Sequence, residues 1–243
     1  MFPDRGCGPS VTAVTGDGEG TAAPSAPALE ITSRSGRVEV RAEPITRPAV
    51  LSGPAEILED GTVRARGSDR IEIACPTGTN VSIGTSSGRV ECHGPLGRVA
   101  ITTSSGRVTI EEATEIEVRS SSGRVDVGHC HGTCRVATTS GTVDIDVADA
   151  VDVTVSSGRV SVGAVGDVAV QGGSGKVEIQ LTRVGTTTVR TLSGSVTIAV
   201  PEGIAPRLGL QTRSGRTSSE VADGSDGLLA VETSSGRIRI VRS

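Results

Sequence analysis

The sequence predicts an all-β protein, a single-stranded β-solenoid (β-helix) of about ten 17–21-residue rungs with an N-terminal capping hairpin. Three observations support this prediction. A Ser-Gly pair recurs along the chain, apolar residues keep fixed distances from it, and aromatic residues are nearly absent, with no Trp, no Tyr and one Phe in 243 residues. A chain that lacks aromatic side chains but is rich in Val, Thr, Ser and Gly favours short strands joined by many turns.

The repeat is centred on ten Ser-Gly pairs, whose glycines are Gly36, Gly88, Gly106, Gly123, Gly141, Gly158, Gly175, Gly194, Gly215 and Gly236. From Gly88 to Gly175 the glycines are 17 or 18 residues apart, and the later spacings are 19 and 21. If each Gly is numbered zero, offsets −7, −5, +2 and +4 are apolar at 37 of 40 positions, the exceptions being Thr187, Thr217 and Ser219. A chain that is 35% hydrophobic would supply about 14 by chance. We expect these four offsets to form the core.

Each repeat therefore holds two short strands whose side chains alternate between core and surface. The tight turn between them requires a positive φ, which glycine adopts without steric cost, and the Ser before it can hydrogen-bond the local backbone. The expected turn glycines of the regular rungs are Gly88, Gly106, Gly123, Gly141, Gly158 and Gly175. Stacked at roughly 4.8 Å, ten rungs would make a rod on the order of 45 Å long. The last repeat, with Ile238 and Ile240, is expected to form its open end.

The organisation along the chain follows from where the repeat holds. Residues 29–243 form the predicted β-solenoid domain, with an irregular capping region at 41–80 and regular rungs at 81–243. Residues 1–28 are rich in Gly, Ala, Pro, Ser and Thr, and are expected to be a flexible N-terminal segment. In the capping region, Asp60-Gly61 lies between Ile57-Leu58 and Val63, which favours a hairpin turn over an eleventh repeat.

Several motifs together resemble the putative-adhesin family of bacterial β-strand-repeat proteins of unknown function. They are the repeated Ser-Gly-x-Val, the Pro-Thr-Gly sequence at 76–78 before the regular rungs, and the closing segment at 233–240. The resemblance covers about residues 29–243 and implies a β-solenoid, without any known ligand or catalytic residue. Many members of the family have Asp after the Gly, where this chain has Arg.

The residue inventory argues against an enzyme and against a bound cofactor. Only three histidines are present, and Ser residues recur in every turn, whereas a catalytic nucleophile would be singular. Carboxylates such as Glu91, Asp126 and Glu178 recur at offset +3 and are expected to be solvated strand positions. No aromatic platform for stacking on sugars exists. We therefore expect neither catalytic nor cofactor-binding residues.

The tightest cluster of metal-binding residue types is His129, Cys130, His131 and Cys134. Imidazole and thiolate groups are zinc ligands, so the cluster could close a tetrahedral site. The register favours the other interpretation, because Cys134 occupies core offset −7 and Cys130 occupies offset +7, where neighbouring repeats have Ala113, Ala148 and Val165. Free cysteine often serves as a small apolar side chain. We expect buried structural cysteines, exposed turn histidines and no metal.

A basic column at offset +1 is the best candidate surface. In the regular rungs it comprises Arg89, Arg107, Arg124, Arg159 and Lys176, and it extends to Arg37, Arg216 and Arg237. One interpretation is structural: acids at offset +3 lie on the same face and offset the repulsion between stacked cations. The other is an anion-binding strip that makes forked Arg contacts to phosphate or carboxylate groups. The first is preferred.

These observations predict a non-enzymatic scaffold that presents a repetitive polar face to an unidentified protein partner. The alternatives are a polyanion-binding protein that uses the Arg column, and a polymerising scaffold that resembles the bactofilins. A formal net charge of −4 argues against specific nucleic-acid binding, and no apolar run approaches the roughly 18 residues of a membrane span.

The N-terminal residues lack the apolar core of a secretory signal, and the five cysteines are odd in number and irregularly spaced. Both features indicate a cytoplasmic protein. Outward arginines near the last strand oppose edge pairing, so we expect a monomer with at most weak end-to-end contacts.

Overall fold

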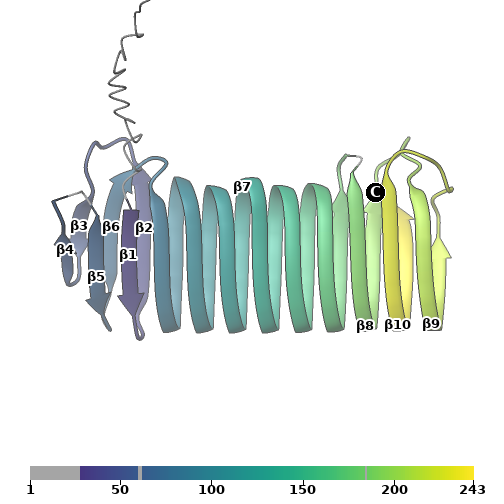
Figure 1. The fold of residues 1–243 in the computed structure, drawn as a ribbon, viewed down its shortest axis with the longest axis horizontal. Coiled ribbons are helices and arrows are strands. Elements are labelled where there is room, and N and C mark those ends of the chain that lie inside the picture. The colour runs from purple at the N-terminus through teal and green to yellow at the C-terminus, as the bar shows by residue number, and fades with distance from the viewer. Residues whose placement is uncertain (1–27, 60–61, 184) are drawn as a thin grey trace, which may run out of the picture.

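A computed structural model describes residues 28–59, 62–183 and 185–243. The predicted flexible segment, apart from Ala28, and the Asp60-Gly61 turn lie outside these residues. The described chain is all-β, which confirms the predicted class, and its strands join in one open sheet (Figure 1). The strands are β1 (Ala28–Ser33), β2 (Arg37–Glu43), β3 (Ala49–Ser52), β4 (Ala55–Ile57), β5 (Val63–Gly67), β6 (Ile71–Pro76), β7 (Asn80–Leu181), β8 (Thr186–Val200), β9 (Arg207–Ser219) and β10 (Leu228–Arg242). Within the described ranges, no helix could cross a membrane.

The repeats lie side by side in parallel register. Strand β7 runs continuously over 102 residues and winds through successive turns of a coil (Figure 1). The turn glycines stack directly on one another: a Cβ built on Gly158 would lie 2.0 Å from the carbonyl oxygen of Gly141. The φ angles of the six expected turn glycines lie between 132° and 146°. Both the backbone conformation and the close approach therefore require glycine at these positions.

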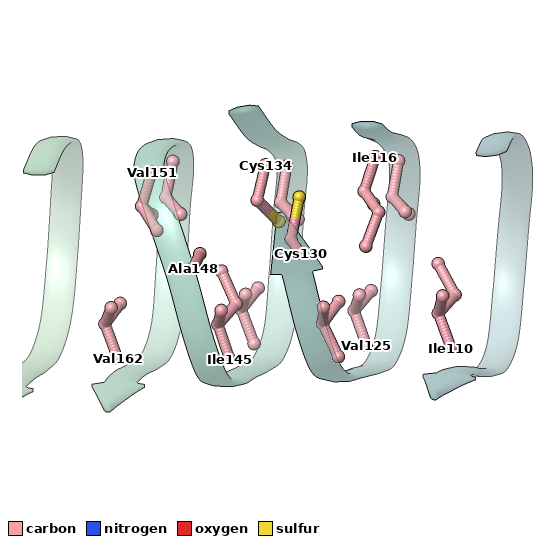
Figure 2. Packing of buried hydrophobic residues seen from close by; sticks show 14 of the residues in the cluster. Ile110, Ile116, Val125, Cys130, Cys134, Ile145, Ala148, Val151 and Val162 are labelled. Atoms are coloured by element: carbon pink, nitrogen blue, oxygen red, sulfur yellow. The ribbon is translucent and has the colours of Figure 1, made fainter. Parts of the chain in front are cut away.

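The four apolar offsets form most of the core, and the residues at offset +7, Ala113, Cys130, Ala148 and Val165, add to it. Of the 40 positions, 36 are buried, and the four that are not are Leu208, Leu210, Thr217 and Ser219, all in β9. Val, Ile and a few small side chains pack between the two walls of the coil (Figure 2). A narrow core of this kind needs no aromatic residue, because each repeat buries only short side chains against the next.

In most repeats, a hydroxyl three residues before the turn glycine also stabilises the turn. In six repeats this Ser or Thr donates a hydrogen bond to the carbonyl oxygen of the Ser at offset −1, at 2.8–3.3 Å. The donors are Ser33, Thr85, Thr103, Ser120, Thr138 and Thr233. Sequence reasoning gave this role to the Ser before the Gly, although the recurrence of hydroxyl residues at offset −3 was visible.

The N-terminal end differs from the expectation for residues 41–80. Strands β1 and β2 lie between β7 on one side and β5–β6 on the other: Leu29 is opposite both Val81 and Val63. Residues 63–76 thus form an additional turn of the coil. They lack the Ser-Gly pair, but Val63, Ala65, Ile71 and Ile73 fill the four core columns and are fully buried.

Two short strands cover this additional turn. β3 pairs antiparallel with β6, and β4 pairs antiparallel with β5, where Ile57 is opposite Val63. The β4–β5 pairing is the hairpin that the Asp-Gly pair predicted, and its two central turn residues lie outside the described part of the chain. The hairpin and the additional turn therefore coexist in this region.

The C-terminal end corrects the expected order of the repeats. β10 pairs with β8 on one side and with β9 on the other, so Gly236 is opposite both Gly194 and Gly215. The last repeat in the sequence is therefore an inner one, and β9 is the outermost strand (Figure 1). Polarity explains this order: Ile238 and Ile240 are fully buried, whereas Thr217 and Ser219 are exposed in β9.

Candidate functional site

The candidate site is the charged face, defined as the outward side chains at offsets +1, +3 and +5 after each turn glycine. The parallel register aligns equivalent residues, so that Arg37 is opposite Arg89. All five predicted surface residues, Arg89, Arg107, Arg124, Arg159 and Lys176, are exposed on it. Thr142 and Ser195 interrupt the basic column. The column is therefore a discontinuous row of cations.

Three of these five cations form ion pairs with acids at offset +3. Arg124 bonds Asp126 at 2.6 Å within its repeat and Asp144 at 2.7 Å in the next one. Lys176 Nζ lies 2.5 Å from Glu178, and Arg89 lies 3.6 Å from Glu91. Ion pairs therefore form both within one repeat and between neighbouring repeats.

Arg107 and Arg159 differ from these three because their repeats have a hydroxyl at offset +3, Thr109 and Ser161. Neither forms an ion pair with any of the described residues. Among the five cations of the regular rungs, they are the two that have no carboxylate bound to them among the described residues.

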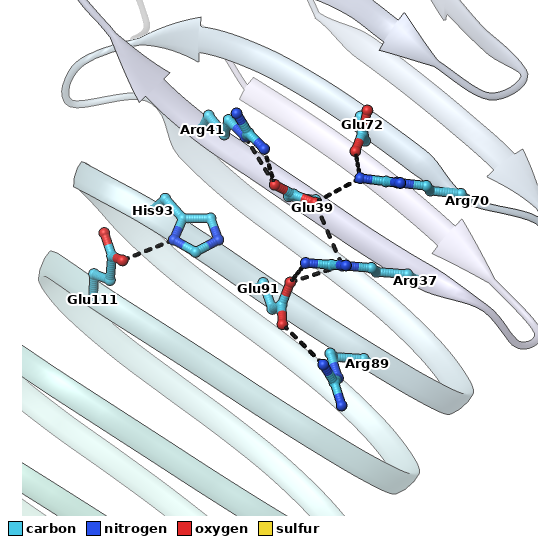
Figure 3. A network of polar contacts seen from close by, with 9 residues as sticks. All are labelled: Arg37, Glu39, Arg41, Arg70, Glu72, Arg89, Glu91, His93 and Glu111. Atoms are coloured by element: carbon cyan, nitrogen blue, oxygen red, sulfur yellow. Dashed lines mark hydrogen bonds and ion pairs between the residues drawn. The ribbon is translucent and has the colours of Figure 1, made fainter.

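A denser network occupies the N-terminal part of the charged face (Figure 3). Glu39 is 2% exposed and accepts a hydrogen bond from Arg41 Nε at 2.8 Å. Arg37 and Arg70 each approach it at 3.4 Å. The hydrogen bond from Arg41, reinforced by the positive charges of Arg37 and Arg70, lowers the pKa of Glu39 below its ordinary value.

Part of this network could be predicted from the sequence. Arg37, Glu39 and Arg41 alternate along one strand, so period-2 geometry places them on one face. Arg70 could not be placed, because the additional turn that carries it has no Ser-Gly pair. Its neighbour in space, β2, is more than 25 residues away in the sequence.

A shallow groove of about 760 Å³ runs along the charged face from the repeat of Gly106 to that of Gly194. Its acidic lining residues are Glu111, Asp126, Asp144, Asp146 and Glu178, and Arg124 is the basic one. Partial burial raises the pKa of Asp144. The negative charges of Asp126 and Asp146 also raise it, whereas the positive charges of Arg124 and Arg159 partly offset the effect. The groove therefore has a negative lining beside the basic column.

A second groove, of about 910 Å³, lies over the first strands of the later repeats. Gln171, Gln211, Arg190 and Glu232 line it, and the last two form an ion pair at 3.2 Å. The side chain of Leu192 is 67% exposed there. Arg213 also lines this groove, which therefore lacks the acidic lining of the groove on the charged face.

The predicted cysteine and histidine cluster divides between core and surface. Cys130 and Cys134 are fully buried and face each other in the core (Figure 2). The interaction between their thiols lowers the pKa of Cys130 and raises that of Cys134, whose burial raises it further. His129 and His131 are exposed and stack with ring centroids 4.2 Å apart.

The cluster does not gather ligands around one point. His131 Nε2 instead bonds Glu112 at 2.8 Å, and the buried Cys92, whose pKa burial raises to about 12, lies in another repeat. Within the described ranges, no three His, Cys, Asp or Glu residues are placed to hold a metal ion.

Comparison with known proteins adds little to this geometry. No protein-family model and no curated protein matches the chain. Among solved structures, a putative cell adhesion protein from Clostridium sporogenes ATCC 15579 aligns with 90% of this chain and 93% of its own. The identity is 10% and the TM-score is 0.23, which supports no argument about fold or function.

Proposed function

We propose that this chain is a non-enzymatic β-solenoid scaffold of about ten 17–21-residue rungs, extended by the turn at 63–76, whose charged face binds a protein partner. The observation that carries the proposal is the row of Arg–acid pairs, held in register by a continuous parallel backbone. Such a row offers a partner hydrogen-bond donors and acceptors at positions fixed by the backbone. The adjoining groove provides a concave surface beside it.

The charge arrangement favours a protein partner over a polyanion. Three of the five candidate cations are already bound to carboxylates, and the groove beside them has an acidic lining. A polyanion would meet these carboxylates along with the arginines. Among these five candidate cations, the polyanion-binding alternative depends on Arg107 and Arg159, which form no ion pair with the described residues.

The proposed scaffold has neither a catalytic site nor a cofactor, because the candidate nucleophiles are engaged in the turns or buried. In six repeats the hydroxyl three residues before the turn glycine bonds the backbone, and the four described cysteines are buried in the core. The four described cysteines are free thiols, which supports the proposal of a cytoplasmic protein, because the cytoplasm is a reducing compartment.

Site-specific photo-crosslinking in cells tests the proposal. A crosslinking residue at Thr109 or Ser161, on the charged face, should give a discrete protein adduct, and the same residue at Thr154, on the other wall of the coil, should not. Equal adducts at all three positions, or none, would contradict it. Heparin binding with a steep salt dependence, abolished in the Arg107→Gln/Arg159→Gln variant, would favour the polyanion alternative.

A further inference from the structure

The strands that carry the chain into and out of the coil are hydrogen-bonded on both sides. At the N-terminal end, β1 pairs with β5 and β7, and β2 pairs with β6 and β7. At the C-terminal end, β10 pairs with β8 from Leu228 to Arg242 and with β9 from Leu228 to Ile240. In a coil whose spatial order followed the sequence, each of these strands would be an edge strand with one neighbour.

This arrangement changes how the coil responds to tension. When a chain is pulled away from an edge strand, the strand peels off by breaking one ladder of hydrogen bonds, residue by residue. A strand between two neighbours must break both ladders at each residue, and it must expose core side chains on both sides. The exposed fraction is at most 1% for each of Leu29, Ile31, Ile238 and Ile240. Pulling out the strand at either end would therefore expose apolar side chains to water, which costs free energy.

Further hydrogen bonds add to the strand pairing of β10 and β1. Near the C-terminal exit from the coil, Arg242 donates to the carbonyl oxygens of Pro201 at 2.9 Å and Ile204 at 2.7 Å. In the turn between β1 and β2, the Arg34 N–H donates to Gly67 on one side, and the Arg34 carbonyl accepts from Ser87 N–H on the other. The two-sided bonding of β1 thus continues into the turn that follows it.

We infer that the coil is built to resist mechanical tension applied between residues 28 and 242. Its outermost strands, β9 and the β3–β4 pair, do not transmit that load, because each belongs to a loop that leaves the coil and returns to it. Their role is to cover the loaded strands. The polarity of Thr217 and Ser219 is what allows β9 to take this outer position. This inference goes beyond the proposed function and needs no partner.

Single-molecule force spectroscopy on the full chain tests the inference, because the same folded protein can be pulled in two geometries. Both use one handle at the N-terminus. The second handle is attached either at the C-terminus, which loads β10, or through a click-reactive residue at Ser218, which loads the edge strand β9. Both proteins should show the same circular dichroism and melting temperature, since Ser218 is exposed.

With one ladder to break instead of two, the first rupture on pulling at Ser218 should need about half the force needed at the C-terminus. It should also release only the short length of β9 and its loops. Equal first-rupture forces, or a lower force at the C-terminus, would overturn the inference. Because the measurement uses the isolated protein, its outcome is independent of whether a partner binds the charged face.

Discussion

The repeats of β9 and β10 are consecutive in the sequence, adjacent in space and aligned residue for residue, yet they occupy different environments. Ile238 and Ile240 in β10 are fully buried, whereas their partners Thr217 and Ser219 in β9 are exposed. Burying one Ile side chain is worth about 1.5–3 kcal/mol. The comparison shows that side-chain polarity, and not chain order, decides which repeat lies at the end of the coil.

The largest expected effect comes from placing a charge in each member of this pair. Ile238→Asp buries an unpaired carboxylate between β8 and β9, and should lower the free energy of unfolding by several kcal/mol. Thr217, the register partner of Ile238, is exposed. Thr217→Asp should therefore alter the free energy of unfolding by no more than about 0.5 kcal/mol. Chemical denaturation of both variants measures the difference. Equal losses would mean that β9 is not the outer strand.

The stacked turns offer a second matched pair. Gly158→Ala adds a Cβ 2.0 Å from the Gly141 carbonyl at a φ of 142°, and should cost about 2–4 kcal/mol. Gly84→Ala is the control, because nothing lies within 4 Å of its Cβ and its φ is not in the left-handed region. It should be neutral or slightly stabilising. A thermal melt in which both variants behave alike would contradict the stacking of the turn glycines.

At the N-terminal end of the coil, a buried ion pair involving Glu39 contributes to stability, whereas the C-terminal pair of repeats differs in apolar burial. Glu39→Gln removes the buried carboxylate that binds Arg41, and should cost about 1–2 kcal/mol at neutral pH. Because the folded-state pKa of Glu39 is depressed, its contribution is present above the unfolded pKa of about 4.3 and is lost as the pH falls through the folded value. The gap between wild type and variant should therefore close in acid. A gap that stays constant from pH 7 to pH 2 would exclude this ion-pair contribution.

The smallest effect is expected on the exposed part of the charged face. Arg124→Gln removes pairs with Asp126 and Asp144, but exposed ion pairs contribute little, so the melting temperature should not change measurably. Its effect should appear instead as weaker capture of the partner. A clear loss of stability would show that the Arg–acid pairs hold the coil together and are not a binding surface.

The strand period and the core positions could be predicted from the sequence, because period-2 alternation around each Ser-Gly pair is a local property. Local alternation also placed Arg124 and Asp126 on one face. The additional turn at 63–76 was missed, because it keeps the apolar columns but has no Ser-Gly pair to mark them. The pairing of Arg70 with Glu39 depends on that turn and was missed with it.

The spatial order of the last repeats could not be predicted in the same way. Every repeat presents the same register to its neighbours, so backbone pairing alone does not distinguish β8–β9–β10 from β8–β10–β9. The distinguishing residues, Thr217 and Ser219, were visible as exceptions to the apolar offsets. An exception at two core positions of one repeat is the signal that this repeat faces water on one side.

Disulfide trapping tests the order of the repeats most directly. Thr197 in β8 is the register partner of Arg239 in β10, so the Thr197→Cys/Arg239→Cys variant should form a disulfide under mild oxidation. Thr197 and Ser218 would be partners only if β9 lay against β8. With β10 between them they are separated by about 9–10 Å, too far for a bond, so Thr197→Cys/Ser218→Cys should stay reduced. Peptide mapping by mass spectrometry distinguishes the two outcomes. A disulfide in the second variant and none in the first would contradict the order β8–β10–β9.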